Sequence, residues 1–261
     1  MSFRPNYYNT QSSNFTITLP ESLNNIISMR ISSINIPFDS IYNITEELGN
    51  NIFRIQDNKQ NIKIDLDDGF YSSDICANNS IINFLNKKLN DNDNDNQLQL
   101  SISSITKKVS IKSSDPKYII SFHNSDDSIP LTLRLGWFLG FRAGTYYGET
   151  EYTSEAPITN TNNSRNFYIA INDYQNNNIN KFSSAFSESL LPDNIITKIN
   201  TQKEVNNSME EAVDRTRYYD GPTQINKLTF TIYDEYGRVV SLNNNDWSCV
   251  LTFEHYRAVK N

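Results

Sequence analysis

The sequence predicts a mainly β protein, built as a single jelly-roll β-sandwich with one amphipathic helix and long loops. Segments in which apolar and polar residues alternate with a period of two recur along most of the 261 residues, which is the pattern of strands with one buried face. Only one segment repeats its apolar residues at helical spacing, so the βαβ alternation typical of α/β enzymes is missing. Hydrophobic residues reach only 37%, but aromatic residues reach 12%, so large side chains can fill a sandwich core.

The first third of the chain predicts three β elements. Residues 15–19 alternate as Phe-Thr-Ile-Thr-Leu, and Pro20 is expected to end this strand. Residues 26–36 are rich in β-branched side chains and predict a second strand. Residues 53–55 and 62–66 alternate on either side of a polar turn, which predicts a hairpin.

The middle of the chain predicts the one helix and three further strands. Apolar residues recur at helical spacing over 73–90, and Ser72, Ser73 or Asp74 can supply the N-cap. Alternation returns at 98–102, 109–111 and 118–122. Residues 131–141 contain two glycines four apart among large apolar residues, which indicates close packing in either a short helix or a turn.

The last third predicts strands at 167–171, 228–232 and 247–253. A turn over 234–237 follows the second of these strands, with Gly237 able to adopt positive φ, and the third strand is expected to return after it as a C-terminal hairpin. The stretch 176–220 mixes polar runs with isolated apolar clusters, which favours long excursions between strands. About ten short strands of this kind predict one sandwich domain over 15–257 with loop insertions, an N-terminal arm over 1–14 and a tail over 258–261.

Composition excludes several classes of partner. The formal net charge is −7 with a pI near 4.9, and no basic block offsets it, so nucleic acid is not expected as a partner. The longest apolar run, near 131–141, contains Arg134 and is far shorter than the ~20 residues that span a bilayer. We therefore expect no membrane insertion. The N-terminus lacks the pattern of a secretory signal, which predicts a soluble protein that is intracellular where it is made. Of the two cysteines, Cys249 is expected to be a buried free thiol.

No pattern predicts a catalytic, cofactor or metal site. The acidic run 91–96 places carboxylates at positions 1, 3 and 5 of a calcium loop, but Asn96 and Ile102 stand where the loop needs Gly and Glu. It is therefore interpreted as a solvated loop. The histidines, His123 and His255, lie in separate strand-like contexts, and no serine stands in a nucleophile elbow. We expect a protein that is not an enzyme and has no cofactor.

Paired tyrosines in turn-rich regions are the candidates for recognition. Such side chains could contact protein neighbours or stack on sugars, and the alternative is that they cover the edges of the core beneath long loops. The pairs are Tyr7 with Tyr8, Tyr146 with Tyr147, and Tyr218 with Tyr219.

Three blocks of sequence carry a resemblance to a known family. The first is Phe15 to Pro20 with Ser28 to Pro37 and Gly49 to Phe53; the second is Leu135 to Arg142 with Tyr168 to Tyr174; the third is Tyr219 to Pro222 with Asp234 to Arg238 and Leu242 to Phe253. In this order the blocks resemble the single jelly-roll penton and minor capsid proteins of nucleocytoplasmic large DNA viruses, the giant viruses.

The resemblance implies a structural subunit of an icosahedral capsid. It implies a homopentamer that closes the fivefold vertices, with copies of itself, the major capsid protein and other minor capsid proteins as partners. The location implied is the capsid shell of the virion, assembled in the host cell cytoplasm. Phe3, Arg4 and Tyr7 would then belong to an arm that reaches a neighbouring capsomer. The alternatives are a minor capsid protein that links major capsid capsomers, a carbohydrate-binding jelly-roll module, and an enzyme built on a β-sandwich.

Overall fold

A computed structural model describes residues 11–57, 61–92, 98–123, 129–159, 166–180, 194–200 and 216–256. It divides the chain into two compact units: unit 1 comprises Met1–Ile41 and Ser164–Asn261, and unit 2 comprises Tyr42–Asn163. The mainly β class with one amphipathic helix is confirmed. The range 15–257, predicted as one domain, contains both units, because the apolar side chains of the inserted segment pack against one another in a core of their own.

Unit 1 is built on one five-stranded antiparallel sheet. Its strand order is β10-β9-β11-β1-β12, with β12 and β10 at the two edges. The bounds are β1 Asn14–Asn35, β9 Asn166–Asn172, β10 Ile195–Asn200, β11 Thr216–Tyr233 and β12 Ser248–His255. The two ends of β11 pair with residues 14–18 and 28–30 of β1, and β1 continues beyond this pairing along β12.

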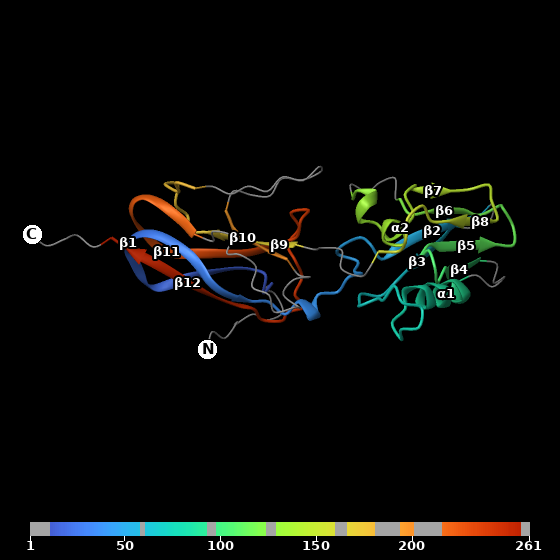
Figure 1. The fold of residues 1–261 in the computed structure, drawn as a ribbon, viewed down its shortest axis with the longest axis horizontal. Helices are drawn as coiled ribbons and strands as arrows, with labels where there is room; N and C mark the ends of the chain where they lie inside the picture. The colour runs from blue at the N-terminus through green and yellow to red at the C-terminus, as the bar shows by residue number, and fades with distance from the viewer. Residues whose placement is uncertain are drawn as a thin grey trace, which may run out of the picture. The chain divides into compact units, whose positions relative to one another are not determined.

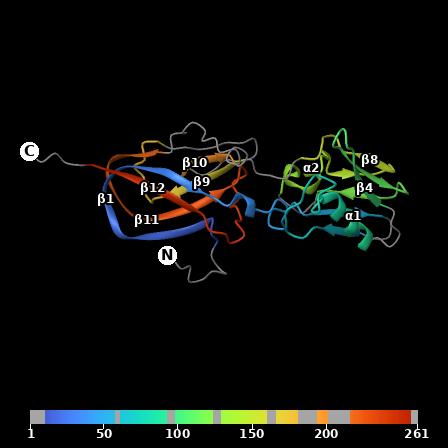
Figure 2. The same cartoon turned by 60° about the horizontal axis from the view of Figure 1, so that its bottom comes forward.

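Both long strands bend in the middle, so the sheet curls over itself (Figures 1 and 2). The pairing of β1 with β11 shifts register between Thr18 and Ser28, where Asn25 adopts a φ of 59°, and Gly221 adopts a φ of 90° in β11. Pro20 was predicted to end the first strand, which is wrong: β1 continues through it to residue 35. A proline without an N–H is tolerated here because this stretch lies at a register shift of the ladder.

The curled sheet encloses the core of unit 1. Inward-facing side chains of β9 and β11 pack with those from the second half of β1, and with residues that follow the β11 turn. Its buried members include Ile26, Met29, Ile31, Phe167, Ile169, Ile171, Leu228, Phe230, Ile232 and Leu242. This arrangement is that of a β-sandwich whose longest strands take part in both layers.

Two further expectations in this half of the chain need correction. The stretch 176–220 was predicted as excursions, but it contains β10 and the beginning of β11. The C-terminal strand was expected to return after the Gly237 turn as a hairpin. Gly237 does have positive φ, 79°, but β12 pairs with β1. The end of β11 is joined to the residues directly after the turn by a bridge between Tyr233 and Val239, which lies before β12.

Unit 2 contains two small antiparallel sheets and one main helix. The four-stranded sheet has the order β3-β2-β6-β7 and the three-stranded sheet the order β4-β5-β8. The bounds are β2 Ile52–Gln56, β3 Asn61–Asp65, α1 Ile81–Asn92, β4 Leu98–Ile102, β5 Val109–Ser113, β6 Ile119–Ser121, α2 Leu135–Phe138, β7 Thr145–Tyr146 and β8 Glu151–Thr153. The predicted hairpin is confirmed by the β2–β3 pairing.

Helix α1 begins eight residues later than predicted. The carboxylate of Asp74 accepts the N–H of Cys76, and the chain stays in turns until Ser80, which bridges Ser72. Asp74 therefore caps a turn instead of the helix. From Ile81 the buried face of the helix packs on the core of unit 2.

The two glycines of 131–141 allow the close packing that their spacing suggested. A Cβ on Gly136 would lie 2.3 Å from the Phe122 ring, and one on Gly140, whose φ is +97°, would lie 2.1 Å from the Ala156 carbonyl oxygen. The segment forms a 3₁₀ turn over Leu131–Leu133 followed by α2. Any larger residue at either position would push unit 2 apart locally.

Candidate functional site

The residues nominated from the sequence differ in their access to solvent. Phe3, Arg4, Tyr7 and Tyr8 lie outside the described residues. In unit 2, Tyr147 is 73% exposed and Tyr146 is half-buried; in unit 1, Tyr218 is 43% exposed and Tyr219 is only 4% exposed. Among these four described tyrosines, Tyr147 and Tyr218 are therefore the ones whose rings are most exposed to solvent, and Tyr219 belongs to the core.

Tyr146 organises a loop of unit 2 instead of facing solvent. Its hydroxyl donates to the carboxylate of Glu155 at 2.8 Å and accepts the backbone N–H groups of Arg142 and Ala143 at 3.1 and 2.9 Å. Burial raises the pKa of Tyr146. Burial alone would also raise the pKa of Glu155, but hydrogen bonds, that from the Arg142 N–H foremost, hold it below the usual value. The network fixes the loop from which Tyr147 projects.

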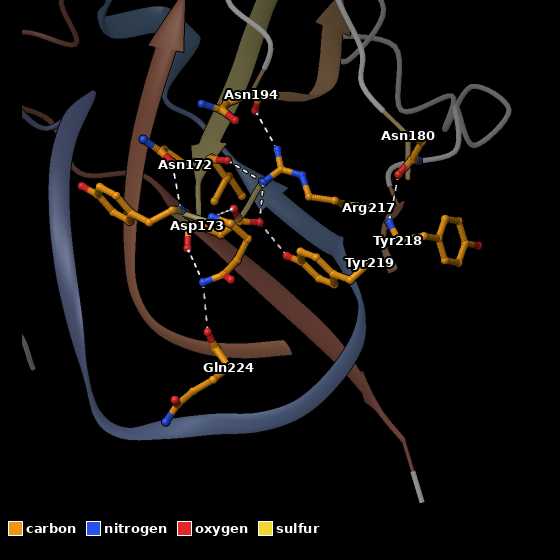
Figure 3. Close-up of polar contacts among 11 residues, drawn as sticks. Asn172, Asp173, Asn180, Asn194, Arg217, Tyr218, Tyr219 and Gln224 are labelled. Atoms are coloured by element: carbon orange, nitrogen blue, oxygen red, sulfur yellow. Dashed lines mark hydrogen bonds and ion pairs between the residues drawn. The ribbon is translucent and has the colours of Figure 1, made fainter. Parts of the chain in front are cut away.

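A buried ion pair lies beneath the exposed tyrosine of unit 1 (Figure 3). Arg217 Nη1 donates to Asp173 Oδ2 at 2.7 Å and to the carbonyl oxygen of Ile171 at 2.8 Å, and its Nη2 donates to the carbonyl oxygen of Asn194 at 3.0 Å. The Tyr219 hydroxyl donates to the same Asp173 oxygen at 2.6 Å. The guanidinium thereby joins the end of β9 to the residue before β10.

The ion pair is sealed from solvent. The side chains of Arg217 and Asp173 are 4% and 1% exposed. Burial first, and then the negative charge of Asp173, raise the pKa of Tyr219 far above its usual range. A sealed ion pair whose carboxylate and guanidinium are both hydrogen-bonded to protein groups offers no open position to a substrate, so its role is to fix the backbone around it.

Residues 173–180, here called the strap, leave β9 and run along the first part of β11. The Asn180 side chain accepts the N–H of Tyr218 at 2.9 Å and donates to the carbonyl oxygen of Thr216 at 2.7 Å. Asn178 forms a β-bridge with Tyr219. The strap therefore behaves as a short extra strand, held at one end by Asp173 and at the other by Asn180 (Figure 3).

The strap and β11 together present two apolar side chains to solvent. The N–H of Ile179 donates to the carbonyl oxygen of Tyr218 at 2.9 Å, so the two residues are neighbours across the bridge. Ile179 is 66% exposed and Tyr218 is 43% exposed. The backbone that carries this aliphatic and this aromatic side chain is already fixed. A partner that binds them would therefore cost little further backbone entropy.

Edge strand β12 is a second surface suited to protein contact. Its residues 248–253 read Ser-Cys-Val-Leu-Thr-Phe, without a charge or a proline, and Val250 is 56% exposed. Charged or proline-containing edges are the usual protection against pairing with another chain. Within the edge, Cys249 is half-buried where full burial was expected, and desolvation raises its pKa to about 11.

The described residues contain no group of three or more His, Cys, Asp or Glu side chains placed to hold a metal ion. His123 and His255 are both exposed, one in each unit. Nor does any helix in the described ranges have the length and apolar character needed to cross a membrane.

The sequence alone could not have revealed the ion pair. Asp173 and Arg217 are 44 residues apart, and each occurs in a stretch where a charged residue is ordinarily solvated. The signal in the sequence that pointed to a buried charge was the position of Asp173, which directly follows a strand with apolar residues on both faces. Ile179 likewise stands alone in an Asn-rich run.

Comparison with known proteins finds a likeness among solved structures. No family model matches the chain, and no curated protein matches it. Among solved structures, the chain is similar to the crystal structure of the selenomethionine-labelled mavirus penton protein, with 13% sequence identity and a TM-score of 0.41. The match covers 93% of this chain and 98% of that chain.

Proposed function

We propose that this chain is a structural capsid protein that acts by packing against other subunits, most specifically as the penton subunit that closes a fivefold vertex as a homopentamer. The observation that carries the proposal is the rigid apolar pair Ile179 and Tyr218, set on the strap above the sealed Asp173–Arg217 ion pair. The sequence resemblance to penton and minor capsid proteins supports the same class.

Exposed side chains on a fixed backbone, such as Ile179 and Tyr218, suit assembly better than catalysis. Tyrosine is enriched at interface hot spots, where a large ring is buried at a small cost in rotamer entropy. The backbone of Tyr218 is fixed on one side by Asn180 and on the other by the Tyr219 hydroxyl bond to Asp173. The pair is therefore prepared to dock without local reordering.

The partners follow from the proposed role. A closed ring of identical subunits uses a heterologous contact, in which one surface of a subunit meets a different surface of the next. Copies of this chain are the first partners, and the major capsid protein and other minor capsid proteins are the next. The proposal includes no cofactor, nucleic acid or catalytic step, and places the protein in the capsid shell after assembly in the host cytoplasm.

The alternative within the same class is a minor capsid protein that links major capsid capsomers. Edge strand β12 favours this alternative, because a linking protein can add its edge to an extended segment of another protein. The two roles differ in self-association: a penton forms a discrete ring, whereas a linker needs no contact with its own copies.

Light scattering on the size-fractionated protein tests the proposal. We expect a discrete pentamer whose fraction rises with protein concentration and does not depend on calcium. The double variant Ile179→Ser and Tyr218→Ser should shift the concentration for half-assembly upward by at least a hundredfold. The matched control is Tyr147→Ser in unit 2, which removes a tyrosine that is more exposed than Tyr218 and should leave assembly unchanged.

Two results would redirect the proposal. A strict monomer at every concentration contradicts the self-assembled ring and favours the linking role. A pentamer that survives the double variant unchanged removes Ile179 and Tyr218 from the interface, and the β12 edge then becomes the surface to mutate.

A further inference from the structure

Tyr174 has a backbone conformation that its residue type disfavours. Its φ is +60°, in the left-handed region, where a bulky side chain is an outlier and Asn or Gly is the usual residue. Three of the five non-glycine residues described with positive φ are asparagines, and about one residue in seven of the whole chain is Asn. Tyrosine therefore stands at a positive-φ position where this chain more often has asparagine. Residues held in disfavoured backbone conformations concentrate at functional sites.

The strained residue is held firmly and its ring is left open. Its backbone N–H donates to the side chain of Asn172 at 2.9 Å, and its hydroxyl shares a hydrogen bond of 2.7 Å with Thr229. The ammonium group of Lys227 lies 4.8 Å from the ring centroid. The side chain remains 50% exposed. Anchoring through both the N–H and the hydroxyl fixes the ring without burying it.

The described surface beside Tyr174 carries hydroxyl and amide groups. Thr229 pairs with Thr16 on one side and with Asn172 on the other, so a polar row crosses β1, β11 and β9. The hydroxyls of Thr16 and Thr229 are 2.7 Å apart. Residues 14–19, 166–172 and 225–232 of these strands contain one charged residue, Lys227.

This chemistry favours a sugar over a protein. A protein partner is best met by contiguous exposed apolar side chains, whereas the described residues that surround Tyr174 on this face are Thr16, Thr229, Asn172 and Lys227. A pyranose ring offers C–H groups on one face, which stack on an aromatic ring, and hydroxyls around its rim, which exchange hydrogen bonds with threonines. The Lys227 ammonium adds attraction for an anionic substituent and can leave the tyrosine ring to meet it.

We propose that the outer face of β9, β11 and β1 around Tyr174 binds a saccharide that carries a carboxylate or sulfate. The pyranose ring stacks on Tyr174, Thr16 and Thr229 bond its hydroxyls, and Lys227 pairs with the acidic group. The site lies on unit 1 and is independent of the capsid role proposed above, since it uses neither Tyr218 nor the β12 edge.

Saturation-transfer NMR on the full chain tests this site with three probes: 3′-sialyllactose, which carries a carboxylate, lactose 3′-sulfate, which carries a sulfate and no carboxylate, and neutral lactose. We expect transfer to the ring protons of an acidic probe, and at least tenfold weaker binding of lactose. The first two probes distinguish carboxylate from sulfate. Lys227→Gln should reduce the affinity for the acidic probe to that for lactose.

Tyr174→Gly is the decisive variant because glycine suits the left-handed backbone. Binding should fall at least tenfold while the melting temperature stays within about 2 °C of wild type or rises. Tyr147→Ser serves as the control and should bind normally. Absence of transfer from all three probes at millimolar concentration overturns the proposal, as does unchanged binding by Tyr174→Gly. A large drop in its melting temperature would assign the ring a structural role instead.

Discussion

Replacing Arg217 by methionine should destabilise unit 1 far more than the loss of an ordinary ion pair. Methionine keeps much of the side-chain volume but removes all donors. It leaves the Asp173 carboxylate, 1% exposed, without its cation, and it leaves the carbonyl oxygens of Ile171 and Asn194 without the guanidinium. Breaking one side of a buried pair costs about 3–5 kcal/mol, because an uncompensated charge stays in the interior.

The matched control is a pair of the same chemistry on the surface. Lys112 and Glu151 lie 3.3 Å apart with side chains 58% and 48% exposed. Lys112→Met should therefore cost less than about 1 kcal/mol. The double variant Asp173→Asn with Arg217→Met should lose less than the two single variants added together, since neutralising the carboxyl removes the unpaired charge.

Urea unfolding followed by tryptophan fluorescence measures these costs separately in each unit. The chain has two tryptophans, with Trp247 in unit 1 and Trp137 in unit 2, so Trp137→Phe isolates the signal of unit 1. For Arg217→Met we expect a loss of about 4 kcal/mol, or a melting temperature about 10–20 °C lower for a domain of this size. A loss below about 1 kcal/mol would refute the argument that the pair is sealed and fully compensated.

Four further outcomes are expected. Residues 42–163 expressed alone should fold, since every member of the core of unit 2 lies within them; a molten spectrum by near-ultraviolet circular dichroism would contradict this. Gly237→Val should lower the melting temperature by several degrees, because φ at that residue is 79° and a β-branched side chain is strained there. An unchanged melting temperature would refute the positive φ assigned to this turn. Alkylation at pH 8 should modify exposed Cys76 well before Cys249, whose pKa burial raises to about 11; equal rates on mass spectrometry would count against it. The pKa of Tyr219 in the folded protein is raised above its unfolded value near 10, so the stability that it contributes is present below pH 10 and is lost as the pH rises further. In Tyr219→Phe the melting temperature should therefore fall less steeply above pH 10.

The local periodicity of the sequence predicted most strands but not their partners. Alternation located β2, β3, β4, β5 and β9 within a few residues, because each has one face in a core formed nearby. It failed at Pro20, where a register shift lets the ladder continue, and at Asp74, which caps a turn ahead of the helix. It could not show that β12 pairs with β1, since pairing across more than two hundred residues leaves no trace in a local pattern.

The candidate site was less predictable than the fold. Paired tyrosines were a fair signal for exposure at Tyr147 and Tyr218, yet in a strand adjacent residues face opposite sides, so Tyr219 had to point inward when Tyr218 pointed outward. The Asp173–Arg217 pair and the strained Tyr174 depend on backbone geometry and on contacts between distant segments. Neither leaves a signature in residue type or spacing.

The pairing of β1 with β11 and β12 also determines the order in which a growing chain can fold. About 180 residues separate the end of β1 from the start of β11, which at roughly 5–20 residues per second is a wait of about 10–40 s during translation. Unit 2 is translated in that interval and can fold while β1 still lacks both of its neighbours. Until β11 and β12 emerge, a nascent chain exposes a 22-residue strand to other nascent chains. Holding that strand unpaired during synthesis is therefore a task for the chaperones of the cell that makes the protein, and a chain interrupted before β11 would be prone to aggregate.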